Sequence, residues 1–71
     1  MFLGRVDLQG NILPLPYIDG WLIRAKQKGV QKVIVSPINF SKAPYIEGVE
    51  VIPLGTVKDL INYLKQAIIN L

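Results

Sequence analysis

This chain of 71 residues carries eight Lys and Arg against five Asp and Glu, giving a net charge of +3, and it contains neither cysteine nor histidine. That composition excludes disulfides, thiolate or imidazole metal ligands and a Ser-His catalytic pair. A domain this small buries only about 60% of its unfolded surface, whereas 51% of its residues are hydrophobic, so we expect apolar surface that another chain covers.

The chain is expected to begin with a β-hairpin over residues 4–16. Apolar and charged side chains alternate from Arg5 to Leu8, which is the period-two pattern of a strand with one solvated face. The pair Gly10-Asn11 then indicates a tight turn. Two prolines in the second arm place that arm at a sheet edge or end it.

Residues 17–28 switch to the spacing of an amphipathic helix. The apolar stripe of this helix consists of Ile18, Trp21, Leu22 and Ala25. Gly29 favours a helix end, because glycine readily adopts the left-handed conformation that closes many helices. The β-branched block that follows predicts a strand over residues 31–35, covered on both faces.

Residues 36–48 are expected to form a connector. Pro37 and Pro44 interrupt regular structure there, and the segment is long enough that we expect a short helical turn near Ser41. A further strand is expected over residues 49–54.

The last element is expected to be a helix over residues 56–70. Thr56 and Asp59 resemble a capping box, with aspartate in place of the usual Glu or Gln. Apolar residues repeat behind this cap at intervals of three and four: Val57, Leu60, Ile61, Leu64, Ala67, Ile68 and Leu71. Tyr63 and Ile69 fall outside the stripe, so we expect them to contact a partner.

Taken in chain order, these elements predict an α/β fold, in which a β-hairpin is followed by two βα units with a mostly parallel sheet. Parallel sheets are normally covered on both faces, and two helices do not suffice for that, so we expect that part of the fold is supplied from elsewhere. No apolar run approaches the roughly 18 residues that span a bilayer. We therefore expect no membrane contact, and the absence of cysteine leads us to expect a cytoplasmic protein.

Four basic residues fall within nine positions: Arg24, Lys26, Lys28 and Lys32. They would form an anion or nucleic-acid patch if they shared one surface. The alternative is a solvated helix end that opposes the negative end of the helix dipole. The sequence favours the second reading, because no aromatic residues are interleaved with the basic ones for base stacking.

Trp21 has two readings of equal weight. It is an interface anchor, as buried tryptophans often are, or it packs into the core with the rest of its stripe.

The acidic residues lack the spacing of metal ligands, and no Gly-x-x-x-x-Gly-Lys loop is present. We expect no cofactor, no metal and no catalysis by this chain alone.

Several segments in this order resemble the Lon-protease-like domain. They are Gly10-Asn11-Ile12-Leu13-Pro14-Leu15-Pro16, the helix that follows, Gly29, Lys32-Val33-Ile34-Val35, Asn39 and Glu47-Gly48-Val49-Glu50-Val51. The resemblance runs from about Phe2 to Leu64 and is closest to the carboxy-terminal domains of the RadA repair protein and of ComM, the magnesium-chelatase-like competence protein. It implies a partial Lon-like domain, because Met1 falls where the family domain would be only partly complete. The chain would then be an excised piece, a processed fragment or a truncated gene product.

The resemblance also has departures. Lon peptidases open this helix with Gly-Gly-Leu-Lys, whose lysine activates a serine nucleophile, and the matching residues here are Pro16-Tyr17-Ile18-Asp19. The nucleophilic serine of the family lies in the preceding half, and the serines present here are Ser36 and Ser41, both in the connector. A carboxylate at Asp19 cannot supply the basic amine that this chemistry needs, and it would instead stabilise the helix start.

These observations lead us to expect a non-catalytic structural or assembly module, the second half of a Lon-like domain. Its partners would be further copies of itself or the missing amino-terminal half, and its parent a ring-forming ATPase of DNA recombination or uptake. The alternatives are a piece or subunit of a Lon-type ATP-dependent serine protease, or a nucleic-acid-binding module.

Overall fold

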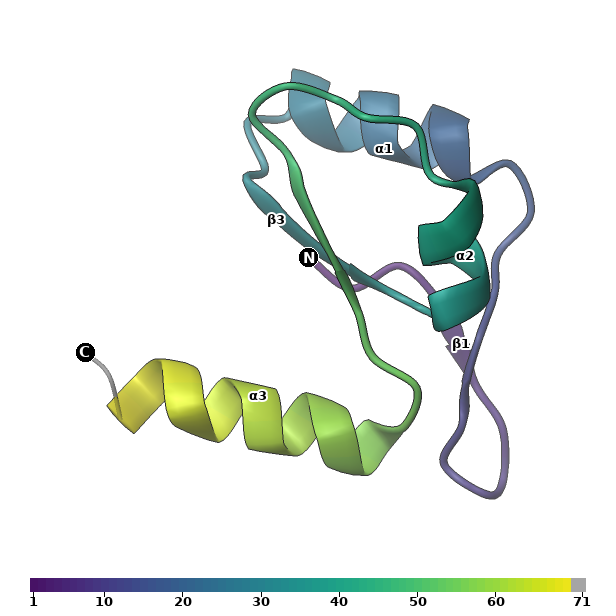
Figure 1. Ribbon diagram of the computed structural model, residues 1–71, viewed down its shortest axis with the longest axis vertical. Helices are drawn as coiled ribbons and strands as arrows, with labels where there is room; N and C mark the ends of the chain where they lie inside the picture. Colours follow the sequence, from purple (N-terminus) through teal and green to yellow (C-terminus); the bar gives the residue numbers. More distant parts are fainter. Residues whose placement is uncertain (70–71) are drawn as a thin grey trace.

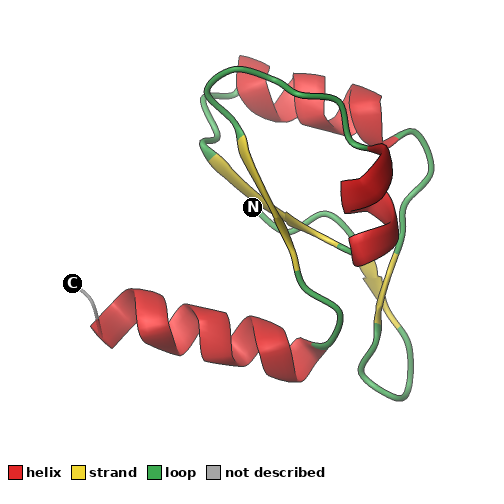
Figure 2. Cartoon of the chain, viewed as in Figure 1, coloured by secondary structure: helices red, strands yellow, loops and turns green. Residues whose placement is uncertain are grey.

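The computed structural model describes residues 1–69. Its elements in chain order are β1 (Arg5–Val6), β2 (Ile12–Leu13), α1 (Ile18–Gln27), β3 (Lys32–Val35), α2 (Pro37–Lys42), β4 (Glu50–Pro53) and α3 (Val57–Ile69). Figure 2 shows the β-hairpin, the parallel strand pair and the helices of an α/β fold. The predicted fold class is confirmed.

The hairpin has shorter strands than the sequence indicated. β1 and β2 pair antiparallel with Val6 opposite Ile12, but Leu8 lies fully exposed in the turn instead of continuing the strand. The cause is Asp7, whose carboxylate accepts hydrogen bonds from the backbone N–H groups of Gln9 and Asn11. Such an Asx arrangement turns the chain and ends the strand at Val6.

The strands form two separate pairs, the antiparallel β1–β2 and the parallel β3–β4, and β3 has a parallel neighbour on each side. It pairs parallel with β4, placing Val33 opposite Val51. On its other side Phe2 forms a parallel bridge with Ile34, an arrangement that the sequence did not predict. Val33, Ile34 and Val35 are all buried, as expected of a β-branched strand covered on both faces.

The core lies between the sheet and α1. Ile18, Leu22 and Ala25 of α1 pack against Val33 and Val35 of β3. Complete burial of a side chain such as Leu22 stabilises the fold by about 2 kcal/mol. Gly29, with φ of 78°, follows the end of α1 in the left-handed conformation.

The segment 36–48, expected to be a connector with one helical turn, contains the helix α2. The helix begins just after Ser36, whose hydroxyl oxygen accepts a hydrogen bond from the Asn39 N–H at 3.1 Å. Pro37 occupies the first helical position, where its missing N–H costs nothing. A serine followed by proline is thus the start signal that the sequence reading passed over.

α3 extends away from the rest of the molecule (Figure 1). Its expected cap is present, since the Thr56 hydroxyl oxygen accepts a hydrogen bond from the Asp59 N–H at 3.1 Å. Residue 70, where the helix was expected to end, and Leu71 lie outside the described residues. None of the helices that the structure describes has the length and apolar character needed to cross a bilayer.

Candidate functional site

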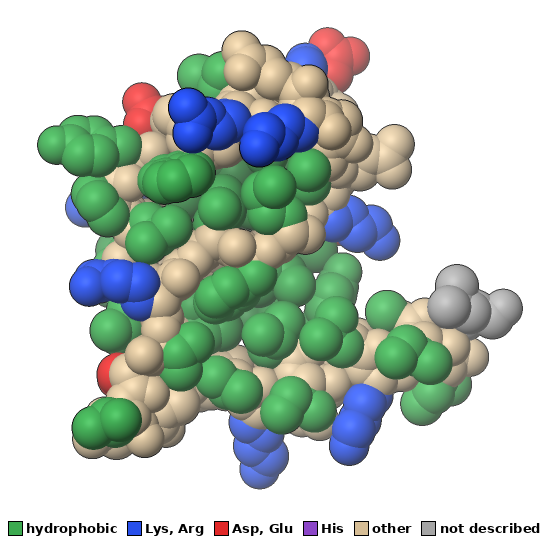
Figure 3. Space-filling view, turned by 180° about the vertical axis from the view of Figure 1, so that it is seen from behind, with side chains coloured by type: hydrophobic (Ala, Val, Ile, Leu, Met, Phe, Trp, Pro, Cys, Tyr) green, Lys and Arg blue, Asp and Glu red, His purple; other side chains and the backbone are tan. Residues whose placement is uncertain are grey.

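The apolar stripe of α3 is only partly used by the fold. No described residue of α3 is buried, and Val57 and Leu60 of the stripe are half-buried. Ile61, Leu64 and Ile68 are 48%, 48% and 69% exposed; we call these three the open α3 face. In the view from behind, hydrophobic side chains gather on α3 and on the body above it (Figure 3).

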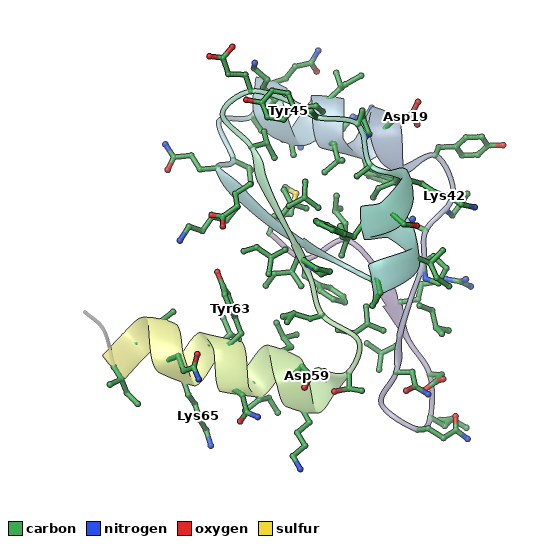
Figure 4. The ribbon with its side chains drawn as sticks, in the orientation of Figure 1. Asp19, Lys42, Tyr45, Asp59, Tyr63 and Lys65 are labelled. Atoms are coloured by element: carbon green, nitrogen blue, oxygen red, sulfur yellow. The ribbon has the colours of Figure 1, made fainter. Side chains whose placement is uncertain are left out.

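Tyr63 and Ile69 were expected to contact a partner. Tyr63 is half-buried and points from α3 toward the rest of the molecule in Figure 4, on the side opposite Lys65. Ile69 is 79% exposed. The partner role of both residues remains a prediction. The three residues of the open α3 face are also exposed, although their place on the apolar stripe predicted that they would pack into the core.

One edge of the sheet has free backbone groups. The Leu3 N–H donates to the Ile34 carbonyl at 2.9 Å, and the Ile34 N–H donates to the Met1 carbonyl at 2.8 Å. Because backbone groups alternate in direction along a strand, the N–H and C=O of Phe2 point away from β3. Within residues 1–69 no backbone partner meets them, so this edge can accept another strand.

The opposite edge, along β4, is a poorer acceptor of a strand. Glu50 and Leu54 donate their N–H groups inward to Gln31 and Val35. The outward positions are therefore Val51 and Pro53, and proline has no N–H to offer. Proline on an edge strand is a common protection against strand addition, so the Met1–Leu3 edge is the open one.

A second exposed surface lies beside α1. Tyr17, Gly20, Trp21 and Arg24 line a shallow pocket of about 260 Å³. Trp21 is 41% exposed, so its ring is not enclosed in the core, and its role as an interface anchor remains a prediction. The Arg24 guanidinium lies over the Trp21 ring, 6.0 Å from its centroid, within the range of a cation–π contact.

The four basic residues of the sequence cluster do not share one surface. Arg24 and Lys28 are four residues apart and lie on one flank of α1, beside Trp21. Lys26 lies on the other flank by the same spacing. Lys32 begins β3 and shares the face of Ile34, opposite the Val33 face that packs on α1. Arg24 and Lys28 are the pair left beside exposed aromatic rings.

The structure shows the surroundings of the three residues that were compared with those of a Lon-type reaction. Asp19 lies in the first turn of α1 and is exposed. Ser36 is 99% buried and caps α2, and the Ser41 hydroxyl donates to the Ile38 carbonyl. The residues that the structure describes also include no cluster of metal-ligating side chains.

Asn39 is a structural residue whose role sequence reasoning missed. Its Oδ1 accepts a hydrogen bond from the Leu15 N–H at 2.8 Å, and its Nδ2 donates to the Leu15 carbonyl at 2.9 Å. The buried amide thus ties the segment before α1 to α2. The Ser36 cap could have located Asn39 at the third helical position, but its long-range partner has no sequence signal.

Comparison with known proteins finds a limited similarity. No family model matches the chain. It is 31% identical over 58 residues to the archaeal Lon protease of Methanocaldococcus jannaschii, a match that covers 82% of this chain and 9% of the relative. It is 30% identical over 71 residues to the archaeal Lon protease of Thermoplasma acidophilum, covering 94% of this chain and 10% of that protein.

The chain therefore spans about a tenth of the length of the curated relatives that it matches. This similarity supports the Lon-like character of the segment that the sequence motifs indicated.

Proposed function

We propose that this chain is a non-catalytic structural and assembly module, the second half of a Lon-like domain. The observation that carries the proposal is the open α3 face. A 13-residue helix with a pronounced apolar stripe gains most of its stability from packing that stripe. Here Ile61, Leu64 and Ile68 remain exposed, so the helix is suited to a surface that another polypeptide provides.

The open Met1–Leu3 edge supports the same proposal from the backbone. The unpaired sheet edge and the uncovered helix face are two separate surfaces that a partner could cover. The amino-terminal half of a Lon-like domain would supply both a strand and a packing surface. Further copies of this chain are the other partner that the proposal admits.

We extend the proposal to the parent assembly. The hairpin segment Gly4–Gly10 and the segment Glu47–Ile52 resemble RadA and ComM, and that resemblance implies a ring-forming ATPase of DNA recombination or uptake. A piece or subunit of a Lon-type ATP-dependent serine protease is the alternative, and the similarity to archaeal Lon proteases is compatible with it. It requires a partner that supplies both serine and lysine, because Asp19 stands at the lysine position.

The test is the solution mass of the full chain by light scattering, together with circular dichroism. We expect the unmodified chain to associate, because its apolar face and open edge are uncovered. The double variant Leu64→Lys/Ile68→Lys places two charges on the open α3 face and should have the mass of a single chain. Its helix content should be unchanged, because these side chains are exposed.

The matched control is Asn62→Lys/Gln66→Lys. It adds the same charge to the same helix, at exposed positions outside the apolar stripe, and should associate like the unmodified chain. If the unmodified chain proved to be a cooperatively folded monomer, the proposal would be refuted. Hydrolysis of casein by the unaided chain would refute its non-catalytic part.

A further inference from the structure

Four exposed residues lie on α1 or directly at its ends, and we call them the aromatic–basic strip: Tyr17, Trp21, Arg24 and Lys28. Tyr17 is 83% exposed and Trp21 is 41% exposed. With Arg24 and Gly20 they surround the shallow pocket. Gly20 contributes no side chain, and a Cβ placed there would meet nothing within 4 Å, so the space between the two rings is open.

The charge along this strip is of one sign. Arg24 and Lys28 follow Trp21 at the helical spacing that places them on the same flank. Asp19, the acidic residue in the first turn of α1, falls on the other flank with Lys26 by that spacing. A ligand lying along the strip would therefore meet aromatic faces first and then two positive charges.

The backbone holds the first ring in a costly conformation. Tyr17 has φ of 60° and is the one non-glycine residue among those described with positive φ. A left-handed conformation outside glycine costs about 1 kcal/mol or more, and such strain is concentrated at functional sites. The ring it presents is nonetheless almost fully exposed, so core packing does not explain the residue.

From these observations we propose that the aromatic–basic strip binds single-stranded nucleic acid. Bases would stack on Tyr17 and on Trp21, where a base would take the place of the Arg24 guanidinium that lies over the ring. Arg24 and Lys28 would then contact the phosphates. Stacking platforms beside a positive track are the recurring solution for unpaired bases. A duplex keeps its bases stacked inside and offers nothing to the two rings. The site is independent of the open α3 face and of the assembly proposed from it.

The experiment uses the full chain and a fluorescein-labelled oligo(dT) of about twelve nucleotides, which falls within the site sizes known for such surfaces. Trp21 is the single tryptophan of the chain, so quenching of its fluorescence reports stacking at this residue. We expect quenching by oligo(dT) and much weaker binding of a duplex of equal length. With two phosphate contacts, log K should fall against log salt concentration with a slope of about −1.4.

Two substitutions separate binding from folding. Tyr17→Gly removes the ring and relieves the strain at φ 60°, so the melting temperature of the chain should rise. Its affinity for oligo(dT) should nevertheless fall at least about fivefold, because one stacked base is lost. Arg24→Gln should reduce the salt slope to about −0.7. Lys26→Gln is the matched control on the other flank and should leave both the affinity and the slope unchanged.

Three results would overturn the proposal. The first is that oligo(dT) leaves Trp21 fluorescence unchanged. The second is that polyphosphate or duplex DNA binds as tightly as oligo(dT), which would reduce the strip to a nonspecific cationic surface. The third is that Tyr17→Gly binds oligo(dT) as well as the unmodified chain. Quenching by a proline-rich or acidic peptide in place of oligo(dT) would assign the strip to a protein partner instead.

Discussion

Asp7 organises the hairpin turn through its charge. Its carboxylate accepts hydrogen bonds from the Asn11 N–H at 2.8 Å, the Asn11 Nδ2 at 3.0 Å and the Gln9 N–H at 2.9 Å. The backbone bond from Asn11 is the main cause that holds the pKa of Asp7 below its ordinary value of 3.8. Bonds to the charged form favour that form.

The turn should therefore weaken in acid. Because the pKa of Asp7 is lowered in the folded state, the unfolded chain binds this proton more readily. The stabilisation that Asp7 provides is therefore complete above its ordinary pKa, and it is lost as the pH falls through the pKa of the folded state. We expect the melting temperature to fall between about pH 5 and pH 2, and to fall less in Asp7→Asn, which does not titrate. Equal pH dependence in the two proteins would contradict this role.

Two other side-chain features could not be read from the sequence. The exposure of Trp21 is one example, since its spacing fits the buried stripe of Ile18 and Leu22 yet its ring lies at the border of that stripe. Asn39 is another, because its partner Leu15 is 24 residues away. Periodicity identifies the face of a helix on which a residue lies, but not how far the core extends across that face.

Ser36 and Thr56 cap two helices that differ in burial. Ser36 is 99% buried, and Ser36→Ala would leave the Asn39 N–H unpaired. We expect the free energy of unfolding to fall by about 1–2 kcal/mol. Thr56→Ala removes the cap of α3, a helix without buried residues, and should fray the helix while lowering global stability by less than about 0.5 kcal/mol.

Urea denaturation measures the global effect of these substitutions, and amide hydrogen exchange measures local opening at the start of α3. Ser41→Ala is the control within α2, because the Ser41 hydroxyl is exposed and bonds only the Ile38 carbonyl. It should change the free energy of unfolding by less than about 0.5 kcal/mol. If Thr56→Ala destabilised the whole chain as much as Ser36→Ala, α3 would be part of the cooperative core.

The elements with strong local signals were predictable. α1 follows from its apolar spacing and Gly29, and β3 from its β-branched block; each is found within a residue of the expected range. α2 was reduced to one turn because its prolines were read as breakers, whereas Pro37 lies where a helix tolerates it. Leu8 was wrongly assigned to a strand because its alternation with Asp7 hid the turn that Asp7 makes.

At the scale of the whole molecule, parallel pairing of β3 and β4 follows from chain order, but the bridge between Phe2 and Ile34 does not. The segment Met1–Leu3 is too short to show a period, and its partner is distant in sequence. The sequence anticipated that apolar surface would remain uncovered, from the excess of apolar residues over what a small domain can bury. It could not locate that surface on α3 and on the Met1–Leu3 edge.

The location of the open edge leads to a prediction for the molecule as a whole. Phe2→Pro removes an N–H that no bond inside the described structure uses, and it leaves intact the bonds of Met1 and Leu3 with Ile34. Proline is tolerated on edge strands but cannot pair with an added one. If association proceeds through this edge, Phe2→Pro should lower the solution mass, while Phe2→Val, which keeps the N–H and a strand-forming side chain, should not.

The comparison with Leu64→Lys/Ile68→Lys then identifies which surface associates. A mass lowered by both variants would mean that the partner covers the edge and the open α3 face together, as a strand with its own packing layer does. A mass lowered by the helix variant alone would leave the edge unpaired and contradict strand addition. Circular dichroism of Phe2→Pro must match that of Phe2→Val, because an unfolded chain would also change its mass.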